Sequence, residues 1–166
     1  MQRHLILATL AFLIGLQAKT QEIPSVRTIQ ETVLETLSII SAPTDQKDWE
    51  KFRKLFLPCA DLTVVSDNSL GQKNARTFSL EEFVRMMQRN TSTSPFSEQQ
   101  INLTVQHYNG IAQAFQTYEL NVGDQKHLGI NSYQLVFDGN TWWIANLVWA
   151  SNQNGVEIPE QYMPKQ

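Results

Sequence analysis

The sequence predicts one α+β domain, in which three helices pack on one face of a strongly curved antiparallel sheet. Residues 26–90 show helical periodicity in three places, whereas residues 107–151 form three apolar-aromatic runs separated by short polar breaks. These runs are rich in Val, Ile, Tyr, Phe, Trp and Thr, which fit a half-buried pleated surface. Helices followed mostly by strands indicate the α+β class.

The chain of 166 residues suits one domain, and its 42% hydrophobic and 17% charged residues describe a globular protein. Its N-terminus differs from the rest. A cationic head with Arg3 precedes the apolar run 5–16, which is too short to span a bilayer, and Ala18 offers a small residue for cleavage. We expect a signal peptide over residues 1–18, a mobile lead over 19–27 and export to the periplasm or the extracellular space. An uncleaved N-terminal anchor is the alternative.

Charge and cysteine content narrow the choice of partners. Loss of the signal peptide removes one Arg and no acidic residue, so the formal net charge changes from −3 to −4. A mildly acidic chain without a stripe of Lys and Arg argues against nucleic acid or an anionic membrane as partner. Cys59 is the only cysteine and cannot form an internal disulfide. Because it follows Pro58 at the end of an expected helix, we predict a buried thiol, with a reactive thiol as the alternative.

Apolar residues at helical spacing predict the helices. The first spans 26–40 and ends before Pro43, because the residue preceding a proline avoids the α region. The second spans 46–57 and ends at Pro58. A third helix follows Ser79, which forms a capping box with Glu82 three residues later. The other segments before the long strands are a strand over 60–65, a loop over 66–77, a loop over 90–95 and a strand over 99–108, and a tail over 152–166 closes the chain.

Alternation assigns faces to the three C-terminal strands, because successive side chains of a strand point to opposite sides. Asp138-Gly139-Asn140 supplies the tight turn between the last two. Trp142 and Trp143 must lie on opposite faces, so we expect at most one of them in the core. The residues expected to share a face are Ala112, Ala114, Gln116 and Tyr118 in the first strand, Asn131, Tyr133 and Leu135 in the second, and Trp143, Ala145, Leu147 and Trp149 in the third.

Several motifs then stand in a recognisable order. They are Asp48-Trp49 with Phe52, Leu55-Phe56 and Ala60; Gly129-Ile130-Asn131-Ser132; Trp142-Trp143-Ile144 with Trp149; and Ile158-Pro159 with Tyr162. Together they resemble the nuclear-transport-factor-2-like superfamily, in particular its small secreted SnoaL-like members from bacteria. The resemblance covers residues 28–151. It implies a cone-shaped, cystatin-like fold with a pocket at the wide end, and a homodimer formed through the outer face of the sheet.

The steroid isomerases of that superfamily allow a comparison residue by residue. Their carboxylate base stands four residues after an alanine that matches Ala60, and this position holds Val64. Proton transfer cannot omit its base, so that isomerase mechanism is not expected. Their oxyanion-binding acid aligns with Tyr133, and their pocket tryptophan aligns with Trp149 across a one-residue difference in the turn.

The expected ligand pocket therefore contains Asn131, Tyr133 and Trp149, joined by Tyr118 and Gln116 if their strand has the matching register. Tyr133 either donates to a ligand oxygen or is a core tyrosine with an internal partner. Asn131 either contacts the ligand or satisfies a buried polar group.

The candidates for catalysis are weak, and they are Tyr133, His107 and Asp61. His107 stands at the end of a strand without a carboxylate fixed beside it, which favours a surface position. His127 lies in a polar turn, so the histidines lack the spacing of metal ligands. We expect no metal site and no cofactor.

Three classes of function fit these observations. The leading one is an exported protein that binds a small apolar or aromatic molecule without assured catalysis. The second is a lyase, isomerase or hydrolase that acts on a small hydrophobic substrate in the same pocket. The third is a structural dimerising module, which predicts a filled cavity with Trp149 and Tyr118 packed against each other.

Overall fold

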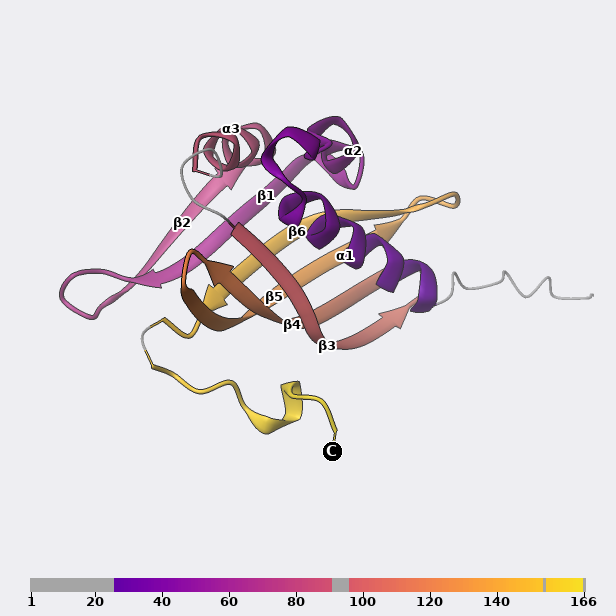
Figure 1. Ribbon diagram of the computed structural model, residues 1–166. Coiled ribbons are helices and arrows are strands. Elements are labelled where there is room, and N and C mark those ends of the chain that lie inside the picture. The colour runs from indigo at the N-terminus through magenta and orange to yellow at the C-terminus, as the bar shows by residue number, and fades with distance from the viewer. Residues whose placement is uncertain (1–25, 91–95, 154, 166) are drawn as a thin grey trace, which may run out of the picture.

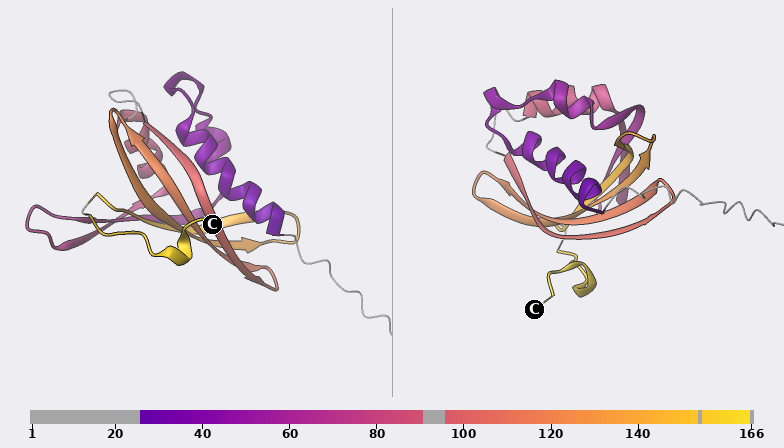
Figure 2. Two further views of the ribbon diagram at one scale, coloured as in Figure 1. Left: turned by 60° about the horizontal axis from the view of Figure 1, so that its bottom comes forward. Right: turned by 90° about the vertical axis from the view of Figure 1, so that its right-hand side faces the viewer.

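The computed structural model describes residues 26–90, 96–153 and 155–165. The predicted signal peptide over 1–18, the start of the lead and most of the loop predicted over 90–95 lie outside the described residues. Within the described part, three α-helices pack on one face of a six-stranded curved sheet (Figures 1 and 2), so the predicted α+β architecture is confirmed. No helix of this part is long and apolar enough to cross a membrane.

The sheet is antiparallel with one exception. Its strand order is β2-β1-β6-β5-β4-β3, and only β1 and β6 pair in parallel. In chain order the elements are α1 (Val26–Ser41), the 3-10 turn η1 (Thr44–Gln46), α2 (Trp49–Arg53), β1 (Phe56–Asp67), β2 (Lys73–Ser79), α3 (Leu80–Asn90), β3 (Phe96–Tyr108), β4 (Ile111–Val122), β5 (Gln125–Phe137), β6 (Trp142–Ser151) and the 3-10 turn η2 (Glu160–Tyr162).

Tight hairpins join the four long strands β3 to β6. Asn109 and Gly110 turn β3 into β4 with φ angles of 43° and 81°, and Gly123 and Gly139 adopt positive φ in the next two turns. The resulting sheet curves into a trough that holds α1, while α2 and α3 lie over the β1–β2 end (Figures 1 and 2). The curvature of the sheet leaves room for a cavity between the sheet and the helices.

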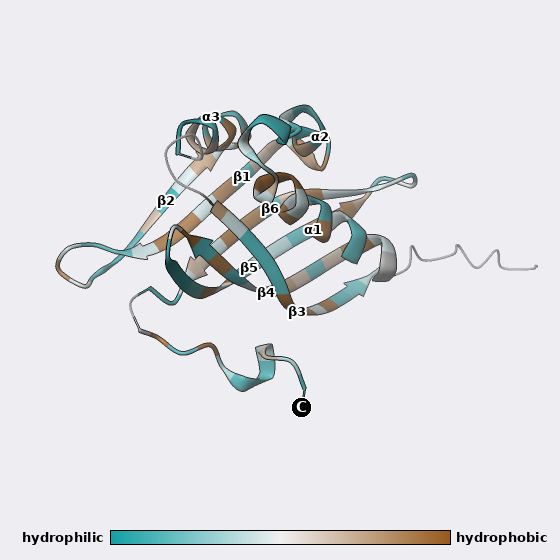
Figure 3. Cartoon of the chain, in the orientation of Figure 1, coloured by the Kyte–Doolittle hydropathy of each residue, from teal (hydrophilic) through white to brown (hydrophobic). Residues whose placement is uncertain are grey.

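Amphipathic helices and alternating strands bury the inner face of this trough. Ile29, Val33 and Leu37 recur at helical spacing in α1 and are buried. Brown and teal segments alternate along the strands in Figure 3, as expected when one face of each strand is covered. α3 starts with the predicted capping box, in which the Glu82 carboxylate accepts from the backbone N–H and from the hydroxyl of Ser79, both at 2.9 Å.

The helix predicted over 46–57 is wrong in its second half. α2 covers only Trp49–Arg53, and Asp48 is its N-cap, because the Asp48 carboxylate accepts from the backbone N–H of Lys51 at 2.8 Å. Phe56 already begins β1. The aromatic residues of this stretch therefore enter the core from a short helix and then from a strand.

Cys59 is exposed, so the predicted buried thiol is also wrong. Pro58 and Cys59 lie in β1 between Phe56 and Asp61, where the register with β6 shifts. Pro58 is tolerated there because a proline suits an irregular stretch of strand. The loop predicted over 66–77 ends early, since its second part belongs to β2, which pairs with β1.

A register shift in β6 overturns one predicted face. Gln134 of β5 opposes Asn146, whereas the next residue of β5 opposes Ile144, so Ala145 is an extra residue in β6. Alternation restarts after this bulge. Contrary to the predicted grouping with Trp143 and Ala145, the residues Leu147 and Trp149 share the inner face with Trp142 and Ile144.

The two adjacent tryptophans lie on opposite faces, as predicted. Trp142 is 2% exposed and packs against Phe137, with ring centroids 5.5 Å apart. Trp143 is half-buried, and its indole Nε1 donates to Asp138 Oδ2 at 2.8 Å. Asp138 also accepts from the backbone N–H of Thr141 at 2.9 Å, so it organises the turn predicted for it.

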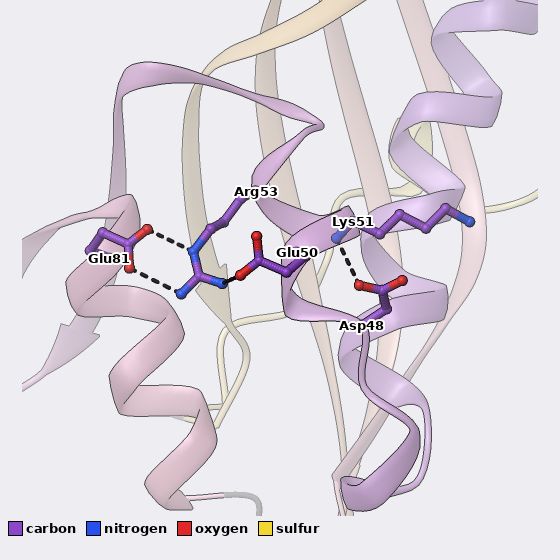
Figure 4. A network of polar contacts seen from close by, with 5 residues as sticks. All are labelled: Asp48, Glu50, Lys51, Arg53 and Glu81. Atoms are coloured by element: carbon purple, nitrogen blue, oxygen red, sulfur yellow. Dashed lines mark hydrogen bonds and ion pairs between the residues drawn. The ribbon is translucent and has the colours of Figure 1, made fainter.

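Ion pairs join the two helices that cover the β1–β2 end (Figure 4). The Arg53 guanidinium donates to both carboxylate oxygens of Glu81, at 2.7 and 3.0 Å, and to Glu50 at 2.9 Å. These groups lie at the surface, where such pairs contribute little free energy but restrict geometry. They hold α2 beside α3.

The C-terminal tail crosses to the outer face of the sheet (Figure 2). The carbonyl oxygen of Tyr162 accepts from Asn102 Nδ2 of β3 at 3.0 Å and from Thr117 Oγ1 of β4 at 2.6 Å. The Tyr162 ring also packs on Phe115, with centroids 5.1 Å apart. The tail thus lies on the side of the sheet opposite to the helices.

Candidate functional site

A cavity of about 290 Å³ lies between the inner face of the sheet and the helices. All three helices and all six strands contribute to its wall. Most of the wall is apolar, with aromatic side chains from Phe52, Phe78, Phe83, Phe96 and Trp149. The rings of Phe83 and Trp149 meet edge to face, with centroids 5.7 Å apart. A cavity of this make-up suits a small, largely apolar molecule.

One corner of the wall carries an acidic side chain, Glu98, the third residue of β3. Its backbone is fixed by Ser41 at the end of α1. The Ser41 hydroxyl accepts from the Glu98 N–H at 2.7 Å and lies 2.9 Å from the Glu98 carbonyl oxygen, to which it donates. This reciprocal pair anchors the start of β3 against α1 and so sets where the carboxyl group enters the cavity.

A chain of side-chain hydrogen bonds leads away from this corner, with Gln116 at its centre. The Gln116 carbonyl oxygen accepts from Asn131 Nδ2 at 3.1 Å and from the Tyr133 hydroxyl at 3.3 Å, and its Nε2 donates to Gln100 at 2.8 Å. The Tyr133 hydroxyl also lies 3.0 Å from the Thr36 hydroxyl of α1. Gln116 is 0% exposed, so these bonds satisfy an amide that would otherwise be costly to bury.

Asn131 connects this chain to Glu98. Its side chain hydrogen-bonds the Glu98 carboxyl as well as Gln116. Burial raises the pKa of Glu98 to about 7, and the bond from Asn131 partly opposes that shift. Glu98 as a whole is half-buried, because one side of it faces the open cavity. Protonated and ionised Glu98 therefore coexist near neutral pH.

Two phenols flank the same corner. Burial raises the pKa of Tyr118 and of Tyr133, and the negative charge of Glu98 raises both further, although the bond to Thr36 acts against this in Tyr133. Both phenols are therefore neutral whenever Glu98 titrates. The Tyr133 hydroxyl is bonded within the protein, whereas that of Tyr118 has no hydrogen-bond partner among the described residues.

The Tyr118 ring can reach this place because the residue opposite it on β5 is Gly129. A Cβ at Gly129 would stand 2.3 Å from the ring carbon Cζ and 2.3 Å from the hydroxyl oxygen of Tyr118. Only a residue without a side chain leaves that space free. Gly129 is thus part of the cavity's construction.

Four of the five predicted pocket residues come together in the wall, and they are Asn131, Tyr133, Trp149 and Tyr118. Gln116 is not part of the wall, and it is the common hydrogen-bond partner of Asn131 and Tyr133. Tyr133 and Asn131 both make internal bonds and both also line the cavity, so the contacts of each fit both alternatives.

The weak catalytic candidates divide. Tyr133 faces the cavity, whereas His107 and Asp61 are exposed and lie outside its wall. Val64, at the position of the isomerase base, does line the cavity. Within the described part of the chain, no group of His, Cys, Asp and Glu side chains could hold a metal ion.

Glu98 and Thr36 are two polar residues of the wall that the sequence did not reveal, in addition to Ser66, Ser151 and Gln153. The strand was predicted to begin at Gln99, one residue too late to include Glu98. A signal was nevertheless present, since Glu98 is the only acidic residue between Glu82 and Glu119 and stands two residues after Phe96, on the same face of a strand. Thr36 gave no comparable signal, because a threonine on the buried side of a helix is common.

Comparisons with known proteins support the fold alone. No family model and no curated protein matches the sequence. A nuclear-transport-factor-2-like protein with a cystatin-like fold from Novosphingobium aromaticivorans superposes with a TM-score of 0.61 at 11% identity, covering 84% of this chain and 88% of that chain. The hexachlorocyclohexane dehydrochlorinase LinA-type3 from Novosphingobium barchaimii gives 0.57 at 15% identity, with 80% and 92% covered. An uncharacterised cystatin-like protein from Caulobacter vibrioides gives 0.57 at 14% identity, with 78% and 93% covered.

This chain therefore has the nuclear-transport-factor-2-like, cystatin-like fold, as the sequence motifs implied. Proteins of one fold differ in activity, so the site has to supply the functional argument.

Proposed function

We propose that this protein is exported and binds a small, mostly apolar or aromatic molecule in the cavity. The observation that supports binding most directly is the composition of the wall, in which aromatic and aliphatic side chains predominate and Glu98 is the one charged residue among those described. Glu98 and its neighbours Asn131, Tyr118, Tyr133 and Thr36 form the polar corner of the cavity. Ligand sites have this make-up because apolar contacts supply affinity and a few polar groups fix orientation. The apolar part of the ligand would lie against Phe83 and Trp149, and its polar group against Glu98.

The structural-module alternative fits less well. It predicts that side chains fill the interior and that Trp149 packs against Tyr118. The aromatic partner of Trp149 is Phe83, and the Tyr118 ring instead lies over Gly129. An unfilled cavity of about 290 Å³ lowers packing contacts, which a purely structural core would gain by closing.

A cavity-filling variant tests the proposal. Val64→Phe places a large ring in the cavity, and Thr63→Phe places the same ring on the exposed side of β1, one residue earlier. Binding of 2-naphthylmethanol would be followed by calorimetry. We expect at least about tenfold weaker binding in Val64→Phe, equivalent to about 1.4 kcal/mol. Equal binding by both folded variants, or none by the unmodified protein, would contradict the proposal.

A second candidate function is proton transfer with Glu98 as general acid or base. It is favoured by an ionisable carboxyl inside an apolar cavity, with a pKa raised to about 7 by burial. A base on β3 could replace the one that is missing at Val64. The similarity of fold to a dehydrochlorinase adds nothing residue by residue, because the identity is only 15%.

Hydrogen exchange of an enolisable ketone tests this second candidate. The α-protons of 2-tetralone exchange in heavy water, and nuclear magnetic resonance measures the rate. If Glu98 acts as base, the protein accelerates exchange and Glu98→Gln lowers the acceleration at least about a hundredfold. Rates equal to buffer with the unmodified protein, under conditions where the ketone is bound, would exclude this role for Glu98.

The homodimer expected through the outer face is also a proposal. The tail with Tyr162 covers the β3–β4 side of that face, which leaves the β6 side, where Val148 is 37% exposed. Sedimentation of the unmodified protein and of Val148→Glu shows whether each is a monomer or a dimer. A dimer that the charge disrupts would support this surface, and a monomer in both samples would exclude it.

A further inference from the structure

The cavity has a negative group without a matching positive one. Among the described residues of its wall there is no Lys, Arg or His, and Glu98 is the only acidic member. Lys47 approaches the outside of this region, but its ammonium donates to the carbonyl oxygen of Ile40. An ionised carboxyl in an apolar site needs a partner of opposite charge or several hydrogen bonds. The protein supplies neither in full.

The hydrogen bond from Asn131 favours the ionised form of the Glu98 carboxyl yet leaves that carboxyl incompletely satisfied. The side-chain amide of Asn131 donates to Gln116 through Nδ2, and the same amide group also hydrogen-bonds the Glu98 carboxyl. A carboxylate has about four lone-pair positions, so one donor leaves others directed into the cavity. Tyr118 contributes a hydroxyl without a partner in the described structure, whose oxygen can also accept.

We propose that the natural ligand carries a protonated amine on an apolar or aromatic body, with the Glu98 carboxylate as its counter-ion in the cavity. This inference rests on the proposed function and narrows it to a class of ligand. An ammonium group would donate to Glu98 and to the Tyr118 oxygen, and its body would fill the apolar part of the cavity. Aromatic side chains close to the corner favour a cation as well, because the faces of their rings are electron-rich.

The other charge classes fit the corner less well. An anionic ligand would meet Glu98 with the same charge and no cation to offset it. A neutral ligand would bind to protonated Glu98 and gain one ordinary hydrogen bond. Charge-assisted bonds are about twice as strong as neutral ones, so the amine uses the corner best.

Three probes of one shape separate these classes. They are 2-naphthylmethylamine, 2-naphthylmethanol and 2-naphthoate, which differ in the group attached to the ring. Each is titrated by calorimetry at pH 7.5 into the unmodified protein, into Glu98→Gln, and into Glu119→Gln. Glu119 lies one residue from Tyr118 and pairs with Lys126 at 3.0 Å outside the cavity, so this control removes the same charge elsewhere on the sheet.

We expect the amine to bind at least about tenfold more tightly than the alcohol, and the carboxylate to bind most weakly. Glu98→Gln should abolish the preference for the amine and leave the alcohol affinity within about threefold, whereas Glu119→Gln should change neither. Equal affinity for amine and alcohol, or an amine preference that survives Glu98→Gln, would overturn this inference and leave the proposed function intact. Binding of none of the probes would overturn both.

The pH dependence gives a second, independent readout. The titratable groups that face Glu98 are Tyr118 and Tyr133, and both stay neutral up to alkaline pH, so Glu98 alone changes charge here. Since the pKa of Glu98 in the empty cavity is about 7, the amine affinity should fall about tenfold per pH unit below that value. The alcohol affinity should not fall. A fall of the same size in Glu98→Gln would overturn the inference, because that variant lacks the titrating carboxyl.

Discussion

The inner face of the sheet has two halves that differ in how completely they are filled. In the packed half, Leu135, Trp142 and Ile144 are at most 2% exposed and lie outside the cavity wall. In the cavity half, the same two strands β5 and β6 present Asn131 and Trp149 to an open space. The change occurs within four residues of β5. Polar side chains therefore lie where the packed core gives way to the cavity.

Helix α1 repeats this division along its length. Its N-terminal part contributes Ile29 and Val33, both 0% exposed, to the packed half. Its C-terminal part contributes Thr36 and Ser41, whose hydroxyls bond to Tyr133 and to the backbone of Glu98. One helix therefore stabilises the domain at one end and positions the polar corner at the other.

The largest effect is expected in the packed half. Leu135→Ala removes a side chain that is 1% exposed and leaves a hole that the neighbours cannot close fully. We expect a loss of about 2–5 kcal/mol in the free energy of unfolding, measured with urea, and unchanged affinity for 2-naphthylmethanol. Val148→Ala on the outer face is the control and should cost less than about 1 kcal/mol. A loss below that in Leu135→Ala would mean that the two halves are not distinct.

Gly129→Ala, in the cavity half, should reduce both the stability of the domain and the binding of a probe. The new Cβ would overlap the Tyr118 ring and also stand 2.8 Å from the carbonyl oxygen of Ala150. We expect a loss of about 1–3 kcal/mol in the free energy of unfolding, and a displaced ring that weakens probe binding. Adding Tyr118→Leu, which lacks the overlapping atoms, should recover part of the loss. Strictly additive losses in this double-mutant cycle would contradict the contact.

Asn131→Leu tests whether the polar corner is also structural. The substitution leaves Gln116 and Glu98 without a shared donor, so we expect a loss of about 1–3 kcal/mol in the free energy of unfolding. Ser132→Leu, at the adjacent outward position, serves as the control in the same urea experiment. Full stability of Asn131→Leu would mean that the amide matters for the ligand alone.

The smallest effect is a dependence of stability on pH. The folded-state pKa of Glu98 is raised from its ordinary value of 4.5 to about 7. The folded protein then binds more protons than the unfolded chain between these values. Stability is therefore highest below about pH 4.5 with respect to this group, falls as the pH rises, and reaches its lower level above 7. A pKa difference of this size corresponds to about 3 kcal/mol. Because solvent partly screens the half-buried carboxyl, we expect a difference of only about 1–2 kcal/mol between unmodified protein and Glu98→Gln across this window. Parallel urea-stability profiles of the two proteins would exclude the raised pKa.

Sequence reasoning succeeded where a simple period ran without interruption. From Ala112 to Tyr118 and from Asn131 to Leu135 the alternation continues unbroken, so the residues that share a face in β4 and in β5 were grouped correctly, although the register of β4 was left open. The same argument failed in β6, because the bulge at Ala145 shifts the period by one residue and leaves no mark in composition.

The errors near α2 have a different physical origin. Trp49, Phe52 and Phe56 stand at helical spacing, yet Phe56 reaches the same aromatic cluster from a strand, with its ring 4.8 Å from that of Phe52. The spacing indicates which side chains are buried, and either a helical or an extended backbone can bury them. Glu98 escaped because its role depends on Ser41 and Asn131, which are brought to it only by the folded sheet.

The reciprocal bond between Ser41 and the backbone of Glu98 makes the polar corner depend on the docking of α1 against β3. Neither the hairpins nor the isolated helix can place that carboxyl, because its strand start is tied to a side chain 57 residues earlier in the chain. The Glu98 amide proton is held by the Ser41 hydroxyl rather than by a neighbouring strand. Its exchange rate with solvent would therefore report the docking of the end of α1, and with it the fraction of molecules whose site is complete.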